Sequence, residues 1–205
     1  MIVASFFAPR FEKWPGVDYD ALLMLLDASC RRLGLPHIVI SDAERPAPLV
    51  SSICSMPQNL MLAILDGQRQ LLEVTDGPVL LVGADCLLTR DPRPFLLGDL
   101  AITLGPFTDC PMNTGAIWCR DGATCACVWR EALDLNPVEW GDDQRVLYRA
   151  VKASGLNVAL LRCEDHNWAP DNVSDPAGMP TVVHFRGPRK AWMAAWAARH
   201  MGLRA

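Results

Sequence analysis

The sequence has no long hydrophobic run, although hydrophobic residues make up 51% of its 205 residues. No stretch approaches the ~20 consecutive apolar residues that a membrane-spanning helix needs, so we expect no membrane span. The chain also lacks an excess of positive charge: 19 Lys and Arg stand against 23 Asp and Glu, a formal net charge of −4. This balance disfavours a protein held to nucleic acid mainly by bulk charge, and the hydrophobic content excludes global disorder.

The eight cysteines lack the Cys-x-x-Cys spacing that is typical of a zinc site. The Cys125-x-Cys127 pair has no matching second pair of ligands. The apolar opening has no basic leader and is followed at once by Pro9 and Arg10, which predicts a buried strand in place of a signal peptide. We therefore expect reduced thiols in a cytoplasmic protein.

Strand and helix patterns alternate along the chain. Apolar runs predict strands at 1–8, 37–41, 79–82, 99–104, 114–119, 157–161 and 181–183. Helical recurrence of apolar residues predicts helices at 19–33, 61–74, 123–133, 143–153 and 190–201. Asp18 is the predicted N-cap of the first helix, and the Pro- and Ser-rich segment 45–52 is a predicted loop. No repeat or linker interrupts this pattern, which predicts one α/β domain over residues 1–205.

Polar residues that directly follow apolar strands are the first candidates for a ligand site, because open α/β sheets bind ligands outside the carboxyl ends of their strands. Asp85 follows the strand at 79–82. A carboxylate in this place can hold a divalent cation, which in turn can neutralise a diphosphate. The alternative is a turn aspartate that caps the next segment.

A second candidate group, His184-Phe-Arg-Gly187-Pro-Arg-Lys190, follows the strand at 181–183. His184 can give a ring nitrogen to a metal ion, and Gly187 lets the backbone approach a ligand closely. Lys190 is a mobile point charge suited to phosphate. The alternative is a solvated basic turn with a structural histidine.

Segment 184–192 resembles the His-aromatic-x-Gly-x-x-Lys-Pro-Trp signature of glycosyltransferase family 8, with Ala191 in place of the proline. Three further elements resemble that family, and all four follow its order: Gly83-Ala84-Asp85 is similar to its Asp-x-Asp segment, Asn113-Thr-Gly115 to its donor-sugar strand, and Asp143-Gln144 to its later Asp-Gln element. The resemblance implies a single GT-A-like domain, with a Rossmann-like mixed sheet flanked by helices.

The same resemblance implies roles for particular residues. Asp85 and His184 would hold the metal, and Ala84, Asp85, Gly187 and Lys190 would contact the nucleotide-sugar donor. Asn113, Asp143 and Gln144 would lie at the reacting centre. Mn²⁺ suits mixed oxygen and nitrogen ligands best, with Mg²⁺ as the alternative. For Asp143 and its neighbour Asp142, a helix N-terminus that favours carboxylates is an equal alternative.

Gly83 stands where the family has its first aspartate, which implies weaker metal or nucleotide binding. Asp91 and Asp109 are the candidates to replace it. The loop 166–172 is a candidate acceptor-side wall, with a packed surface loop as the alternative.

Three functions follow from these residues. The first is metal-assisted transfer of a sugar from a nucleotide-diphosphate sugar to a hydroxyl acceptor on a glycan or a lipid-linked sugar. The resemblance implies a UDP-linked donor and retention. The second is a degenerate module that binds nucleotide or sugar without turnover. The third is a viral-type transferase acting on hydroxymethylated DNA bases, with Arg186, Arg189 and Lys190 meeting phosphate. The negative net charge argues against this third function.

Overall fold

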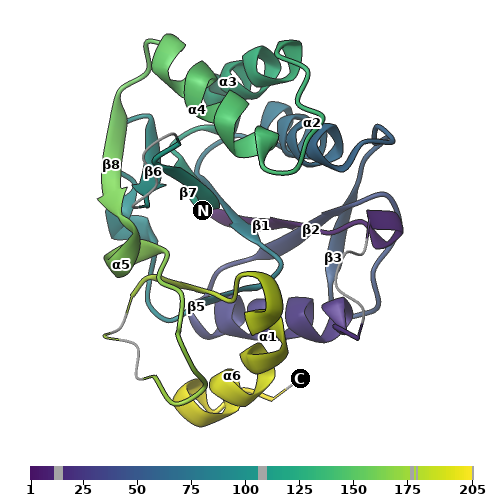
Figure 1. Cartoon of the computed structure of the whole chain (residues 1–205), viewed down its shortest axis with the longest axis vertical. Coiled ribbons are helices and arrows are strands. Elements are labelled where there is room, and N and C mark those ends of the chain that lie inside the picture. The colour runs from purple at the N-terminus through teal and green to yellow at the C-terminus, as the bar shows by residue number, and fades with distance from the viewer. Residues whose placement is uncertain (12–15, 106–109, 176–177, 179, 205) are drawn as a thin grey trace.

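A seven-stranded mixed sheet in the order β3-β2-β1-β4-β7-β6-β8 forms the centre of the computed structural model, which describes residues 1–11, 16–105, 110–175, 178 and 180–204 (Figure 1). Strands β3, β2, β1 and β4 are parallel, β7 is antiparallel to both of its neighbours, and β8 is parallel to β6. A separate antiparallel pair joins β5 to β9. The strands are β1 (Ile2–Phe6), β2 (His37–Ser41), β3 (Val50–Ile53), β4 (Val79–Gly83), β5 (Cys86–Leu88), β6 (Leu100–Leu104), β7 (Met112–Cys119), β8 (Val158–Arg162) and β9 (Val182–His184).

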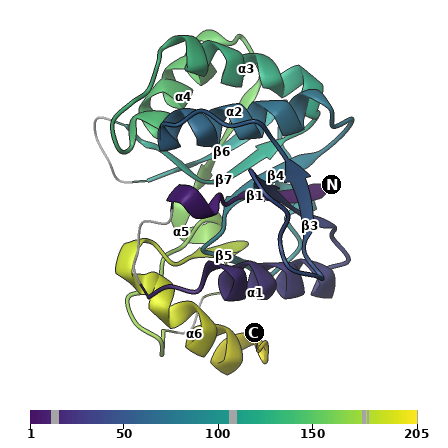
Figure 2. The same ribbon diagram turned by 90° about the vertical axis from the view of Figure 1, so that its right-hand side faces the viewer.

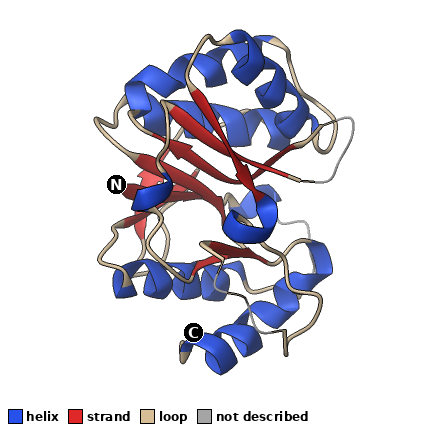
Figure 3. Cartoon of the chain, turned by 90° about the vertical axis from the view of Figure 1, so that its left-hand side faces the viewer, coloured by secondary structure: helices blue, strands red, loops and turns tan. Residues whose placement is uncertain are grey.

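Helices cover both faces of the large sheet: α2, α3 and α4 lie on one side, and α1 and α6 on the other (Figures 2 and 3). The α-helices are α1 (Tyr19–Arg32), α2 (Leu60–Glu73), α3 (Gly122–Asp134), α4 (Asp142–Ala153), α5 (Cys163–His166) and α6 (Met193–Met201), and short 3-10 helices lie at Pro9–Phe11, Arg93–Phe95 and Gly187–Trp192. This arrangement confirms the expected mixed sheet flanked by helices. None of the helices in the described part of the chain combines the length and the apolar character needed to cross a membrane.

Two buried layers follow from the alternation of side chains along the strands. Ile117 faces α2–α4 and packs with Trp129 in one cluster. Its neighbour Trp118 faces the opposite way and packs with Leu26 and Cys30 of α1. The predicted cap of α1 is confirmed, because Oδ1 of Asp18 accepts a hydrogen bond from the amide of Ala21 at 3.0 Å.

Two strands lie where the sequence analysis predicts none. β3 takes up part of the predicted loop 45–52 and is held as an edge strand by parallel pairing with β2, while its Val50 and Ile53 stay exposed. β5 is only three residues long and exists because β9 pairs with it. Both strands depend on backbone partners distant in sequence, which no local pattern reports.

The predicted helix 190–201 is also divided in the structure. Its first part belongs to the 3-10 helix Gly187–Trp192, which starts at a glycine with φ of +59° and a proline, and α6 begins only at Met193. Lys190 therefore lies on a tight turn and not on a regular α-helix.

Strand register brings the candidate residues to one edge of the sheet. Val82 of β4 pairs with Ala116 of antiparallel β7, so residues 113–115 lie beyond it, beside the segment that follows β4. Cys86 pairs with His184, which sets His184 next to the residue that follows Asp85. This edge carries the carboxyl ends of β1 and β4, between which the order of the parallel strands reverses, as in other open α/β ligand sites.

Candidate functional site

A pocket of about 590 Å³ opens at the carboxyl ends of β1 and β4. Its wall includes every residue to which the sequence analysis assigns metal, donor or catalytic contacts: Ala84, Asp85, Asn113, Asp143, Gln144, His184, Gly187 and Lys190. The structure thus brings four segments, which are distant in sequence, to a single cavity. The individual roles of these residues remain predictions.

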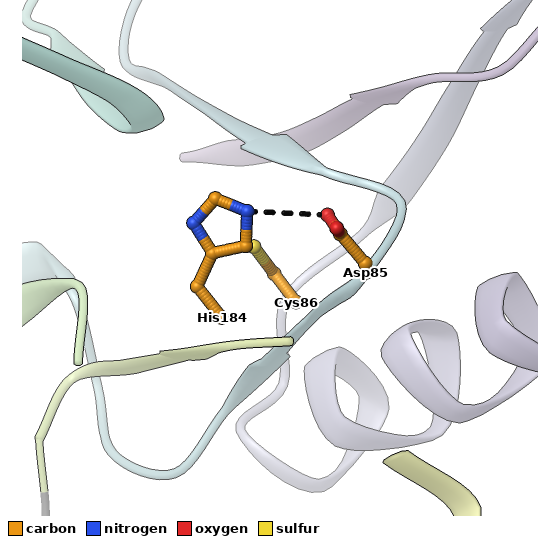
Figure 4. A group of neighbouring side chains, drawn as sticks. All are labelled: Asp85, Cys86 and His184. Atoms are coloured by element: carbon orange, nitrogen blue, oxygen red, sulfur yellow. Dashed lines mark ion pairs between the residues drawn. The ribbon is translucent and has the colours of Figure 1, made fainter. Parts of the chain in front are cut away.

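Asp85 lines the pocket, and Figure 4 shows its carboxylate facing the imidazole of His184. Its Oδ1 lies 3.3 Å from Nε2 of His184, and its Oδ2 pairs with the ammonium group of Lys190. The side chains of all three are largely buried, with 10% to 13% of each exposed. The Asp85 carboxylate therefore contacts both the imidazole and the ammonium group at the wall of the pocket.

Burial by itself would raise the pKa of the Asp85 carboxyl, but the charges and hydrogen bonds of a protonated His184 and of Lys190 outweigh it and hold this pKa well below its usual range. Asp85 is therefore ionised at neutral pH. Cys86 also lies within 4.8 Å of the two metal-ligand candidates. Burial raises the pKa of its thiol far above the usual value, and its sulfur donates to the carbonyl oxygen of Gly115 at 3.5 Å. A thiol is a softer ligand than Mn²⁺ and Mg²⁺ prefer, so Cys86 is a weaker candidate than Asp85 or His184.

Two predicted sugar contacts are fixed by backbone hydrogen bonds. Oδ1 of Asn113 accepts from the amide of Gly115 at 2.9 Å, and Oε1 of Gln144 accepts from the amide of Thr114 at 3.3 Å. The second bond ties the first turn of α4 to β7. Among the described residues no group bonds to either side-chain amide nitrogen, so each nitrogen is left to bind a ligand.

Asp142 and Asp143 behave differently although they are adjacent. Oδ2 of Asp142 accepts from the amide of Glu139 at 2.9 Å, so this residue closes the loop before α4 and has a lowered pKa. Asp143 lines the pocket, and burial raises its pKa, with a smaller contribution from the charge of Asp142. The helix N-terminus predicted as an alternative is present, and Asp143 lines the pocket as well.

Two pocket residues carry features that the sequence analysis missed. Gln68 of α2 shares its helix face with apolar side chains, and its Oε1 accepts from the indole of buried Trp129 at 2.8 Å. A polar residue within an apolar helical stripe was the signal that could have identified it. Arg186, considered only as a contact to DNA phosphate, lines the pocket and donates to the carbonyl oxygen of Asn167 at 3.3 Å.

Other candidates lie elsewhere. Asp91 pairs with Arg93 at 2.8 Å and is not among the residues that line the pocket, so it does not replace the aspartate missing at position 83. Asp109 lies outside the described residues. Of the three cations considered for DNA phosphate, Arg186 and Lys190 line the pocket, whereas Arg189 lies outside its wall and pairs with Asp171 at 3.0 Å.

No protein-family model matches the sequence, and a search of curated proteins finds no relative. Solved structures do match the fold. A glycosyltransferase involved in the glycosylation of the major capsid of PBCV-1 matches with a TM-score of 0.63 at 11% identity, over 96% of this chain and 99% of the other. The galactosyltransferase LgtC, in complex with donor and acceptor sugar analogs, matches with a TM-score of 0.59 at 13% identity, over 97% and 96% of the two chains.

Glycosyltransferase GlyE of Streptococcus pneumoniae TIGR4 also matches, with a TM-score of 0.62 at 12% identity, and this chain spans 60% of its length. Identities this low establish the fold alone. The mixed sheet, its flanking helices and the extent of the matches show that the chain has a fold like that of GT-A glycosyltransferases.

Proposed function

We propose that the chain is a glycosyltransferase that moves a sugar from a nucleotide-diphosphate sugar, UDP-linked, to a hydroxyl acceptor. The proposal rests on one observation: Asp85 contacts both His184 and Lys190 in the pocket of a GT-A-like fold, where the order of the parallel strands reverses. We place the activity in one domain over residues 1–205. We further propose that it works in the cytoplasm, which the eight free thiols favour.

The donor atoms at this wall fit a divalent cation. Two ligand atoms at adjacent corners of an octahedral site with bonds of about 2.1 Å are about 3.0 Å apart. Oδ1 of Asp85 and Nε2 of His184 are 3.3 Å apart, close to this separation. We propose that they would hold Mn²⁺, or Mg²⁺ as the alternative. The bound ion would supply positive charge that stabilises a diphosphate leaving group.

The side chains of the pocket supply the remaining chemistry. Lys190 and Arg186 bring positive charge to the wall where the diphosphate would lie, and Gly187 lets the backbone come close. The amide groups of Asn113 and Gln144 would bind and orient the donor sugar through hydrogen bonds. The apolar part of the pocket, formed by β1 and α2, excludes water from the reacting groups.

Asp143 would accept a proton or a hydroxyl hydrogen bond near the reacting sugar, since burial favours a basic carboxylate there. We propose that the anomeric configuration is retained, as the resemblance to family 8 implies. The product's anomeric proton coupling, measured by NMR, tests this point.

A module that binds nucleotide without turnover is the second candidate, and Gly83 favours it. One carboxylate is missing from the expected metal site, and the remaining one already pairs with Lys190. Such a protein would keep its affinity for a nucleoside diphosphate and fail to release one from any donor.

The test uses the whole chain with a panel of nucleotide-diphosphate sugars, Mn²⁺ and a broad set of saccharide acceptors, and follows the release of nucleoside diphosphate. We expect release with UDP-sugars that stops when EDTA removes the metal. Binding of UDP without release supports the second candidate. A chain that binds none of the donors contradicts both functions.

Gly83→Ala tests how closely Asp85 is held. A Cβ atom at position 83 would lie 2.4 Å from Oδ1 of Asp85, so this oxygen, which faces His184, must shift. We expect Mn²⁺ affinity to fall about tenfold, as it does when outer contacts of a metal ligand change, with little loss of thermal stability. Gly178→Ala is the matched control, because nothing lies within 4 Å of its added Cβ. Equal affinities in the two variants would overturn this prediction.

A further inference from the structure

Asn167 lies behind the site and not in it. It follows α5 directly, it is fully buried, and it does not line the pocket. The loop 166–172 was predicted as a candidate acceptor wall, but the Asn167 side chain is enclosed between β6 and the imidazole of His184. A fully buried amide has to satisfy its polar atoms within the protein, and its partners here define what it does.

The hydrogen bonds of Asn167 orient its amide. Oγ1 of Thr103 donates to the carbonyl oxygen of Asn113 at 3.1 Å, so this hydroxyl proton is already used. The hydroxyl oxygen therefore accepts, and Nδ2 of Asn167 donates to it at 3.0 Å. The amide oxygen of Asn167 is left to face His184, at 3.1 Å from its Nδ1.

This orientation decides which nitrogen of His184 carries the proton. An amide oxygen can only accept, so Nδ1 must be the donor in this contact. In the protonated ring, Nε2 also carries a proton and donates to Asp85; in the neutral ring, Nδ1 keeps its proton and Nε2 is unprotonated and offers a lone pair. That nitrogen faces Oδ1 of Asp85 at 3.3 Å, while the other carboxylate oxygen is paired with Lys190.

A lone pair that faces a carboxylate oxygen is favourable only when a cation or a proton lies between them. In the opposite tautomer, Nε2 carries the proton and donates to Asp85, so it has no lone pair to offer a metal ion. The ring lies in the space that a side chain at position 115 would fill, because a Cβ added to Gly115 would lie 2.2 Å from Nδ1. Nδ1 of His184 thus lies beside Gly115 and donates a hydrogen bond to the amide oxygen of Asn167.

We infer that Asn167 is a positioning residue, which keeps His184 in its Nδ1–H tautomer and thereby presents Nε2 and Asp85 as a ligand pair for a divalent cation. The inference rests on the proposed metal site. The chain Thr103–Asn167–His184 also links that site to the carbonyl oxygen of Asn113, the predicted donor-sugar residue, so both parts of the pocket depend on one buried network. Partners of this kind change metal affinity by about 10- to 100-fold.

The test measures two quantities in the whole chain: the tautomer of His184 in the metal-free protein, from its ring nitrogen shifts with the ring neutral, and the Kd for Mn²⁺. In the unmodified protein we expect the Nδ1–H form. Asn167→Leu should lose it and raise the Kd for Mn²⁺ about 10- to 100-fold. Asn167→Asp should keep the tautomer and an affinity close to that of the unmodified protein, because a carboxylate oxygen still accepts from Nδ1.

A milder variant covers the case in which Asn167→Leu does not fold. Thr103→Val removes only the hydroxyl that orients the amide, and it should shift the tautomer and weaken Mn²⁺ binding in the same direction. Thr181→Val is the matched control, because Thr181 is equally buried and its hydroxyl contacts a different histidine, His166, at 3.0 Å. This control should leave both quantities unchanged.

The outcomes separate the inference from the proposed function. An Nε2–H ring in the unmodified protein, or an Asn167→Leu variant with unchanged tautomer and unchanged Kd, overturns the inference alone. A chain with the expected tautomer that binds no Mn²⁺ overturns the metal site, and with it the role of Asn167.

Discussion

Replacing Asp85 with asparagine is expected to reduce sugar transfer by about 10²- to 10³-fold, the loss that follows removal of one charge-stabilising group from an active site. The carboxylate is ionised because His184 and Lys190 hold its pKa well below the usual range. Asparagine keeps the shape but has no charge to share between these two partners. The measurement is the release of UDP from a UDP-sugar at saturating Mn²⁺.

Part of the effect of Asp85→Asn falls on stability, because Lys190 is left largely buried without its counter-ion. The double variant Asp85→Asn with Lys190→Met removes both charges and should recover much of the lost melting temperature while transfer stays low. Asp91→Asn, in an ion pair outside the pocket wall, is the control for a lost carboxylate. Recovery of transfer in the double variant would mean that Asp85 serves only the fold.

Asp143→Asn should lower transfer by about 10²-fold or more, as expected for a group that handles a proton, and at the same time stabilise the protein at neutral pH. Burial raises the pKa of Asp143 above its ordinary value of 3.8, so the native state binds this proton more tightly than the unfolded state does. Stability therefore falls as the pH rises through the interval above 3.8, and the cost persists at pH 7. Asparagine is neutral at every pH, so the variant does not pay the free-energy cost of a buried ionised carboxylate.

The pH dependence of the melting temperature checks this prediction. Asp143→Asn and the unmodified protein should have similar melting temperatures below the ordinary carboxyl pKa, and the variant should be the more stable at pH 7. Asp142→Asn should behave in the opposite way: the hydrogen bond from the Glu139 amide lowers the pKa of Asp142, so its stabilising effect is present at neutral pH and lost on acidification. A destabilised Asp143→Asn variant at pH 7 would contradict the role assigned to burial.

Much of the fold could be predicted from local patterns. The helix cap at Asp18 and the strand that ends before Asp85 are encoded by residues close to one another in sequence. The β3 edge and the three-residue β5 could not be predicted, because each is held by hydrogen bonds to a distant strand and has too few residues to show periodicity.

The candidate site, like the fold, could be predicted from the sequence only in part. Asp85 and His184 could be named because each follows an apolar strand, where ligands collect in α/β sheets. Their separation of 3.3 Å depends on the pairing of β5 with β9, which the sequence does not display. Asn167 could not be assigned, because its role comes from a contact with Thr103, which is distant in sequence. Gln68 could be singled out as a polar residue on an apolar helix face, but its contact with Trp129 could not be predicted.

The proposed cation between Asp85 and His184 is tested most directly by a crystal soaked with Mn²⁺ and UDP, with diffraction measured at the manganese absorption edge. We expect an anomalous peak within bonding distance of Oδ1 of Asp85 and Nε2 of His184, with the diphosphate on the side of Lys190. A nucleotide bound in the pocket with no anomalous peak at these two atoms, or a peak elsewhere, would contradict it.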